Sequence, residues 1–465
     1  MQFLYSLLLY VLIPLVLTRL TWRGLRNRGY WRRWPERFGF VPRLSETATT
    51  RDDGHFGLLP SRGITPSLEG RRAEREAVSE RGLIHSTNAG TVLPLIWLHA
   101  VSVGEVRASA PLIKALARDY PGHRILITTM TPTGSATVHE LFGAAVAHCY
   151  VPYDLPTAVW RFLNRTRPRF ALIMETELWP NLFHQCRKRG IPLVLANVRM
   201  SEKSARGYQR FAGFTRSTLE CINRVGAQTE ADAERMRALG ARQVEVTGSI
   251  KFDMDVPADL AARSSALRKG FGERPVWVAA STRAGEEEHI LDAHERLRTR
   301  IPGLLLVLVP RHPERFDSVA RLCHQRGFRV ERRSERRDSV DADTAILLGD
   351  SMGEMLLFHA AADVSYIGGS LVPLGGQNLL EAAAVGTPVV FGPHMFNFSE
   401  ISRMALERGA GRQVQDTVEL ANAVADYLEN PAARIAAGEA GLRMVAENRG
   451  ALDRTLMLLR NAFNG

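Results

Sequence analysis

VLPLIWLHA, residues 92–100, begins a repeating pattern that decides the fold class. A helical pattern over 106–119 follows it, and short apolar runs then alternate with amphipathic stretches. The later runs are ILITTM (125–130), FALIM (170–174) and IPLVLAN (191–197), with helical patterns after Gly134 and after Pro180. Apolar strands that alternate with helices predict a parallel sheet with crossover helices.

The same alternation starts again in the second half of the chain, after VEVTGSIKF (244–252) and a less regular stretch. The runs are VWVAAS (276–281), LLLVLVP (304–310), AILL (345–348), DVSYIGG (363–369) and TPVVFG (387–392). We therefore predict an α/β fold with two doubly wound, Rossmann-like domains, at 91–255 and at 271–465 with terminal helices, joined by a linker at 256–270. Ligands bind outside the carboxyl ends of such strands, so we expect the site in a cleft that the two domains face.

The composition fits a globular protein of 465 residues, 45% hydrophobic and 23% charged, and excludes a collagen or a small disulfide scaffold. The formal net charge is +11, but eight arginines and only Glu36 fall within residues 1–44, so the excess is concentrated at one end. This distribution argues against nucleic acid as a partner. The four cysteines form no C-x-x-C pair, and we interpret them as buried free thiols in a reducing compartment.

The N-terminal stretch FLYSLLLYVLIPLVL, residues 3–17, is apolar apart from Ser6, and the arginines begin directly after it. This pattern predicts a membrane-anchor helix followed by a basic juxtamembrane segment, together residues 1–44. The run is shorter than the ~20 residues that span a bilayer comfortably, so a tilted span, local thinning and insertion into one leaflet all stay open. Because the arginines lie on the C-terminal side of the apolar run, we expect the rest of the chain to lie in the cytoplasm. Their positive charges suit the anionic lipid headgroups of the cytoplasmic leaflet. The alternative is a hydrophobic helix in a soluble core.

Glutamates follow two predicted strands of the first domain. WLHAVSVGE ends one strand and places Glu105 near a helix N-terminus, and ALIMETELWPN ends another strand with Glu175 and Glu177. Carboxylates at the tips of buried strands predict a polar site suited to acid or base chemistry. The alternatives are that Glu105 compensates a helix dipole and that one of the other two acids caps a helix.

Basic residues follow two further predicted elements. Lys251 lies in GSIKFD, where the first domain ends, and its ammonium could reach the expected cleft. Arg311 follows the apolar run 304–310, and an arginine there can hold a phosphate with two hydrogen bonds. A solvated surface side chain is the alternative for each.

The most specific segments are GDSMGEM (349–355) and GGSLVPLGGQNLLEAAAVGTPVVFG (368–392). Their glycines allow close backbone approach, and helix N-termini after such turns offer N–H groups to phosphate. Glu381 lies three residues after Asn378 on one helical face and can accept two ribose hydroxyls, so we predict a nucleotide-sugar ligand. The alternative is that these two residues form a local capping pair.

No pattern in the chain indicates a metal ion or a cofactor. The D-x-D strings at 253–255 and 341–343 are interpreted as chance, because neither follows an apolar strand. The thirteen histidines show no H-E-x-x-H spacing. We therefore predict no metal ligands and no cofactor.

Taken together, these motifs resemble one family, the 3-deoxy-D-manno-octulosonic acid (Kdo) transferases of lipopolysaccharide synthesis. The resemblance runs from about residue 97 to 399, and RWPERFGF near the N-terminus also matches. The shared strings are HAVSVGE, TTMTPTGS, VPYDLP, METELWPN, VTGSIKFD, VPRHPERF, MGEM, GGSLVPLGGQN, LEAAA and GPHMFNF.

The resemblance implies a GT-B glycosyltransferase at the cytoplasmic side of the bacterial inner membrane, held by membrane lipids through residues 1–44. It would transfer Kdo from CMP-Kdo to lipid IVA in lipopolysaccharide core and Kdo2-lipid A biosynthesis, with inversion and without a metal or cofactor. On this pattern Glu105 is the general base, and Glu175 and Lys251 stabilise the transition state. The CMP-binding positions would be Pro310, Arg311, Gly353, Glu354, Met355, Asn378, Leu379, Leu380 and Glu381.

Three features depart from the family pattern. Residues 45–90, which we predict to be a flexible insertion, are longer than is usual there, Gln377 stands where histidine is more usual, and STRAGEE replaces a form closer to STHEGEE. Two other interpretations stay open: a GT-B transferase or epimerase that uses a UDP-sugar, and a membrane protein that binds ligands without catalysis.

Overall fold

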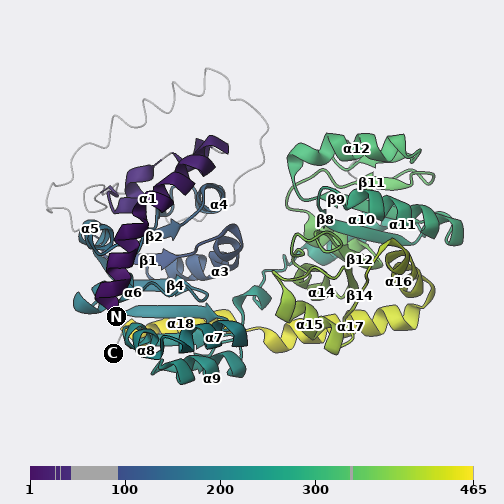
Figure 1. Ribbon diagram of the computed structural model, residues 1–465. Helices are drawn as coiled ribbons and strands as arrows, with labels where there is room; N and C mark the ends of the chain where they lie inside the picture. The colour runs from purple at the N-terminus through teal and green to yellow at the C-terminus, as the bar shows by residue number, and fades with distance from the viewer. Residues whose placement is uncertain (27, 32, 43–92, 336–338, 464–465) are drawn as a thin grey trace, which may run out of the picture. The chain divides into compact units, whose positions relative to one another are not determined.

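The computed structural model describes residues 1–26, 28–31, 33–42, 93–335 and 339–463, so the predicted insertion at 45–90 lies outside the described residues. The chain forms two compact units (Figure 1). Unit 1 comprises 1–226, 231–245 and 459–465, and unit 2 comprises 227–230 and 246–458. Relative to the predicted limits, residues 246–255 fall in unit 2 and the C-terminal residues 459–465 return to unit 1.

Unit 1 is built on a seven-stranded sheet with the order β3-β2-β1-β4-β5-β6-β7, and β1 pairs in parallel with both β2 and β4. The strands are β1 (Leu95–His99), β2 (Arg124–Thr129), β3 (Ala147–Tyr150), β4 (Pro168–Met174), β5 (Leu193–Val198), β6 (Arg224–Ala227) and β7 (Val244–Val246). The helices are α3 (Val103–Asp119), α4 (Pro132–Phe142), α5 (Pro156–Thr166), α6 (Pro180–Lys188), α7 (Glu202–Gln209), α8 (Ala212–Leu219) and α9 (Glu230–Leu239).

Unit 2 repeats this plan with the strand order β10-β11-β9-β8-β12-β13-β14. The strands are β8 (Val276–Thr282), β9 (Leu305–Pro310), β10 (Val330–Arg332), β11 (Ile346–Leu348), β12 (Val364–Ile367), β13 (Val389–Phe391) and β14 (Gly411–Gln413). The helices are α10 (Leu260–Phe271), α11 (Glu287–Arg300), α12 (Phe316–Gln325), α13 (Met355–Ala361), α14 (Leu380–Ala384), α15 (Ser399–Glu407), α16 (Thr417–Glu429) and α17 (Pro431–Asn448), and α18 (Ala451–Phe463) runs from unit 2 into unit 1.

The prediction of two doubly wound α/β domains is confirmed by these sheets. Helices cover both faces of each sheet, so every residue of β1 and of β9 is buried. This burial on both sides explains why neither strand alternates apolar and polar residues. The cores centre on large aromatic side chains: in unit 1 Trp97 packs edge-on against Phe162, and in unit 2 Trp277 is fully buried. The four cysteines are free and buried, as predicted.

Local sequence signals set where several helices begin. Proline occupies the first position of α4, α5, α6 and α17, where its missing N–H costs nothing. Helix α3 begins three residues before the predicted 106, because the Ser102 side chain accepts a hydrogen bond from the backbone N–H of Glu105 and caps the helix.

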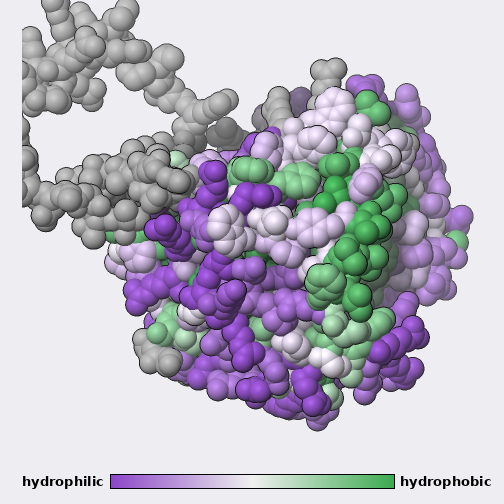
Figure 2. Space-filling view, turned by 60° about the vertical axis from the view of Figure 1, so that its left-hand side comes forward, coloured by the Kyte–Doolittle hydropathy of each residue, from purple (hydrophilic) through white to green (hydrophobic). Residues whose placement is uncertain are grey.

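The N-terminal helix α1 (Gln2–Arg26) lies along unit 1 and turns an apolar face outward. Over Gln2–Trp22 its mean hydropathy is 2.0 and only 6% of the window is buried. Its polar side chains contact α5, α6 and the loop between β3 and α5: Tyr5 donates to Asp154 (3.0 Å), Ser6 donates to Asn181 (3.0 Å) and Tyr10 lies 2.9 Å from Thr157. Figure 2 shows a hydrophobic strip on this side of the unit. The exposed apolar residues of α1 include Phe3, Leu4, Leu7, Leu8, Val11 and Leu15.

The segment after α1 packs against the edge of the unit 1 sheet. Arg33 donates to Glu36 (2.7 Å), whose second oxygen accepts the backbone N–H of Tyr150 on β3 (2.9 Å). Arg37 is buried, donates to the carbonyl of Met130 (2.9 Å) and lies over the Tyr150 ring. For Arg37 the expectation of contact with lipid headgroups is therefore wrong, because its guanidinium is buried inside unit 1. The Arg33 side chain is 33% exposed, and its contact with lipid stays a prediction.

Candidate active site

Glu105 lies in the first turn of α3, directly after the buried strand β1, and is 8% exposed. One carboxylate oxygen accepts the backbone N–H of Val101 (2.8 Å) and the other accepts the hydroxyl of Ser102 (2.8 Å). Glu105 therefore also holds the residues at the start of α3, one of which, Ser102, caps the helix. The alternative that Glu105 compensates the helix dipole stays open beside a catalytic role. An ionised carboxylate has about four acceptor sites, and two hydrogen bonds leave lone pairs for a substrate proton.

The surroundings of Glu105 favour its protonated form more than those of an exposed glutamate do. Burial, and then the negative charge of Glu175, raise the pKa of Glu105 to about 7, and the charge of Glu177 adds a smaller contribution. The hydrogen bonds from Val101 and Ser102 oppose this change in pKa because they stabilise the ionised form. A carboxylate with a pKa near the working pH is well matched to general-base catalysis.

Glu175 and Glu177 follow β4, the strand beside β1. Glu175 adopts a left-handed backbone conformation (φ 59°), which is costly for a non-glycine residue and typical of constrained functional sites. Glu177 accepts the indole N–H of Trp179 (3.0 Å), and the Trp179 ring lies edge-on to the fully buried His99. The structure therefore places three acidic side chains at the carboxyl ends of two adjacent strands.

The third predicted catalytic residue, Lys251, belongs to the other unit. It lies in a single 3-10 turn (Ile250–Phe252) of unit 2, with its ammonium 5.5 Å from the centre of the Phe398 ring. The predicted catalytic residues are thus divided, with Glu105 and Glu175 in unit 1 and Lys251 in unit 2.

All predicted nucleotide-binding residues lie in unit 2. Pro310 ends β9. The backbone N–H of Arg311, the next residue, donates to the carbonyl of Thr282 at the end of β8, with an N···O distance of 3.0 Å. Gly353 has a positive φ of 81° and precedes Glu354, which accepts both a bidentate contact from Arg333 and the hydroxyl of Ser351. Met355 then begins α13.

Asn378, Leu379, Leu380 and Glu381 lie at the start of the short helix α14. The side chain of Asn378 accepts the backbone N–H of Leu380 (3.2 Å) and donates to Glu381 (3.3 Å). The local capping pair that the sequence left open as an alternative is therefore present. This contact occupies one oxygen of Glu381. Acceptance of ribose hydroxyls by Glu381 stays a prediction.

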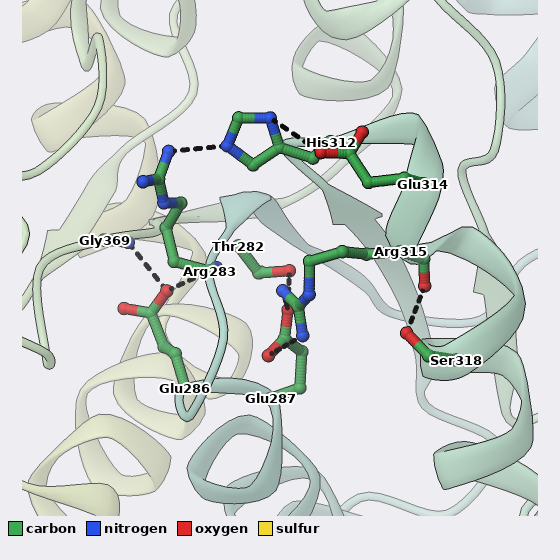
Figure 3. Close-up of polar contacts among 9 residues, drawn as sticks. All are labelled: Thr282, Arg283, Glu286, Glu287, His312, Glu314, Arg315, Ser318 and Gly369. Carbon is green, nitrogen blue, oxygen red and sulfur yellow. Dashed lines mark hydrogen bonds and ion pairs between the residues drawn. The ribbon is translucent and has the colours of Figure 1, made fainter. Parts of the chain in front are cut away.

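Figure 3 shows a buried glutamate that organises the glycine turn and that the sequence did not single out. Glu286 is fully buried and accepts the backbone N–H groups of Gly369 (2.6 Å), Ser370 (3.1 Å) and Leu371 (3.2 Å). One of its oxygens, Oε1, also accepts the hydroxyl of Tyr366 (2.5 Å). A single carboxylate therefore fixes the turn that follows β12.

The neighbouring Glu287 links the end of β8 to the turn that follows β9. Its carboxylate accepts the Thr282 hydroxyl (2.9 Å) and forms a bidentate ion pair with Arg315, with one contact at 2.9 Å (Figure 3). Because Glu287 is fully buried, this pairing is needed to compensate its charge. The sequence signal that could have identified Glu286 and Glu287 is the pair of acids in STRAGEE, directly after a predicted strand.

The two D-x-D strings have structural partners. Asp253 accepts the backbone N–H groups of Gly450 and Leu452 and caps α18, and Asp341 and Asp343 both pair with Arg329. Within the ranges that the structure describes, no three His, Cys, Asp or Glu side chains form a group that could hold a metal ion.

The two parallel seven-stranded sheets, with acidic strand ends in one unit and a glycine-rich turn in the other, define a glycosyltransferase-type GT-B fold. A solved structure of this kind, MurG of Acinetobacter baumannii, has a TM-score of 0.52 at 10% identity, over 79% of this chain and 99% of that chain. Similarity at this level of identity concerns the fold alone.

Sequence relatives define the family. The family model for 3-deoxy-D-manno-octulosonic-acid transferase (kdotransferase) matches residues 32–254. The 3-deoxy-D-manno-octulosonic acid transferase of Haemophilus influenzae is 38% identical over 99% of this chain and 98% of that protein. That of Bordetella pertussis is 41% identical over 79% of this chain and 87% of that protein. The chain belongs to the Kdo transferase family and is a glycosyltransferase, so the resemblance inferred from its motifs is confirmed.

Proposed function

We propose that this Kdo transferase moves Kdo from CMP-Kdo to lipid IVA in lipopolysaccharide core and Kdo2-lipid A biosynthesis, with inversion at the anomeric carbon. The observation that carries the mechanism is Glu105, a buried carboxylate at a strand end whose pKa is raised to about 7 by burial and by the charge of Glu175. The family membership of the protein supports Kdo as the transferred sugar, and the names of its relatives give that sugar as their own substrate.

Glu105 acts as the general base in this proposal. Its ionised carboxylate takes the proton of the acceptor hydroxyl while the hydroxyl oxygen attacks the anomeric carbon of Kdo. The bond from that carbon to the phosphate oxygen breaks, and CMP leaves with the electron pair. Attack opposite the leaving group inverts the anomeric centre. Glu175 and Lys251 stabilise the charges that develop in the transition state.

The donor nucleotide binds to unit 2. Arg311 neutralises the phosphate of CMP, the backbone around 353–355 and 378–380 approaches the nucleotide, and Glu381 accepts ribose hydroxyls. The guanidinium of Arg311 and helix N-terminal N–H groups stabilise the leaving phosphate, so the reaction proceeds without a metal ion. Addition of EDTA should therefore leave the rate unchanged, and a requirement restored specifically by Mg²⁺ would contradict this part of the proposal.

The protein associates with the cytoplasmic face of the inner membrane through α1. Hydrogen bonds from Tyr5, Ser6 and Tyr10 to unit 1 support an arrangement in which the helix lies in the membrane surface instead of crossing it. A perpendicular span would pull these side chains away from Asp154, Asn181 and Thr157. The outward apolar face then inserts into one leaflet, as interfacial helices do.

The direct test is product analysis with purified protein, CMP-Kdo and lipid IVA. The product should gain mass in increments of one Kdo unit, and the anomeric configuration of the new linkage should be opposite to that of the donor. UDP-sugars should neither support transfer nor compete with CMP-Kdo. Transfer from a UDP-sugar would show that the second enzymatic interpretation is the correct one.

A further inference from the structure

A second arginine, Arg283, lies beside the proposed nucleotide site at the end of β8. Its guanidinium Nη1 lies 2.9 Å from Nε2 of His312, and its backbone N–H bonds to Glu286 (3.2 Å; Figure 3). Ser281, two residues earlier, has a φ of 56°, and the pairing with β9 shifts register there. The chain leaves the strand through this irregularity, which places Arg283 at the strand end.

The charge of Arg283 is not neutralised within the part of the chain that the structure describes. The two nearest acids in sequence are committed elsewhere: Glu286 accepts the backbone N–H groups of the glycine turn, and Glu287 pairs with Arg315. Arg283 donates a hydrogen bond to Nε2 of His312, because a guanidinium can only donate. This nitrogen is therefore the acceptor, and the imidazole ring is neutral in this contact. A half-buried guanidinium without a carboxylate partner suits an anionic ligand.

Arg283 also borders the glycine turn. A Cβ built on Gly369 would lie 3.3 Å from Cγ of Arg283 and 3.4 Å from the side-chain nitrogen of Gln377. Glycine at 369 therefore keeps this space open between the two polar side chains. On the other side, Arg311 follows the strand that pairs with β8.

The donor of the proposed reaction carries two anionic groups, the phosphate of CMP and the carboxylate of the sugar acid. We propose that Arg283 binds the carboxylate of the Kdo residue, while Arg311 holds the phosphate. Nη1 is engaged with His312, so the Nε and Nη2 hydrogens present the planar edge that matches a carboxylate. Gln377 lies on the same side of Gly369 and offers an amide donor. His312 is a positioning residue that orients the guanidinium.

This inference rests on the proposed function, and equilibrium binding separates the two. The full-length variants Arg283→Gln, Arg283→Lys and Arg311→Gln are titrated with CMP and with CMP-Kdo in the absence of acceptor. CMP lacks the carboxylate, so Arg283→Gln should weaken CMP-Kdo binding by about 10- to 100-fold and leave CMP binding within about twofold. Arg283→Lys should recover part of the loss, because lysine keeps the charge but not the planar edge.

Arg311→Gln is the matched control and should weaken both ligands together. Retained CMP binding by the Arg283 variants shows that unit 2 is folded. His312→Ala should raise the KM for CMP-Kdo more than it lowers kcat, with CMP inhibition unchanged. Equal losses for CMP and CMP-Kdo in Arg283→Gln, or no loss for either, would overturn the assignment. Failure of the wild-type protein to transfer Kdo from CMP-Kdo would instead refute the proposed function.

Discussion

Glu105 and Glu175 follow adjacent parallel strands, and burial together with the charge of Glu175 raises the pKa of Glu105 to about 7. Two hydrogen bonds to the Glu105 carboxylate act in the opposite direction and keep the pKa from rising further. In the proposed mechanism Glu105 exchanges the proton, and Glu175 raises the pKa of Glu105 in addition to stabilising charge in the transition state.

This relationship predicts the pH dependence of transfer. Below pH 7 Glu105 is increasingly protonated and cannot accept the proton of the acceptor hydroxyl, so kcat/KM should fall about tenfold per pH unit. Glu175→Gln removes a charge that raises the pKa of Glu105, so the acidic limb of the profile should move to lower pH. Glu177→Gln is the matched control, and its shift should be smaller because the charge of Glu177 contributes less. An unmoved acidic limb in Glu175→Gln would disprove this coupling.

Arg311→Ala should raise the KM for CMP-Kdo and weaken inhibition by CMP. Loss of a charge-assisted hydrogen bond costs about 1.5 to 3 kcal/mol. Isothermal calorimetry with CMP measures the loss without turnover. Arg321→Ala, on the exposed face of α12, serves as the control for removal of a positive charge and should bind CMP normally. Unchanged CMP affinity in Arg311→Ala would remove this residue from the nucleotide site.

Glu286→Gln should loosen the glycine turn. The substitution replaces one of the two carboxylate oxygens with an NH2 group, which donates and cannot accept. The turn then loses either the contact from Gly369 at one oxygen or those from Ser370 and Leu371 at the other. Hydrogen exchange of at least one of these three amides should accelerate, and exchange within β8 should not. Glu288→Gln alters an exposed neighbour and should leave the exchange unchanged. Equal protection of the turn in both variants would show that Glu286 does not hold it.

The position of α1 can be tested with nitroxide labels on vesicle-bound protein. Leu4 and Leu15 are both exposed on α1, and Leu4→Cys and Leu15→Cys place one label at each. A helix in the membrane surface puts both labels at similar depth. A perpendicular span separates them by about 16 Å, at 1.5 Å per residue. Ser6→Cys, on the side that contacts Asn181, should be shielded from lipid-soluble quenchers. A large difference in depth between the first two labels would contradict the proposed arrangement.

Much of the fold follows from sequence periodicity alone. Apolar runs such as FALIM and LLLVLVP are long enough and regular enough to indicate buried parallel strands, and both lie in the sheets. Proline at Pro156 and Pro180 marks helix starts for a steric reason that acts locally. The strand-end position of Glu105 follows from the same pattern, because the strand and its following helix are both visible in the sequence.

The contacts that organise the site depend on residues far apart in the chain. Glu286 is held by Tyr366 and by a turn more than 80 residues later, and no local pattern reveals such a partner. Arg37 resembles any other arginine of a basic segment, yet it donates to Met130, 93 residues away. Buried polar networks of this kind arise from tertiary packing, so their residues are recognised only once the fold is known.

The most direct test of the account is single-turnover Kdo transfer by Glu105→Gln. Glutamine, like glutamate, is favoured three residues after a serine N-cap, so the variant should keep the start of α3 and lose only the base. The rate of transfer from CMP-Kdo to lipid IVA should fall by about 10² to 10⁴, with CMP affinity unchanged. A variant that transfers Kdo at more than about half the wild-type rate would contradict the role of Glu105 as general base.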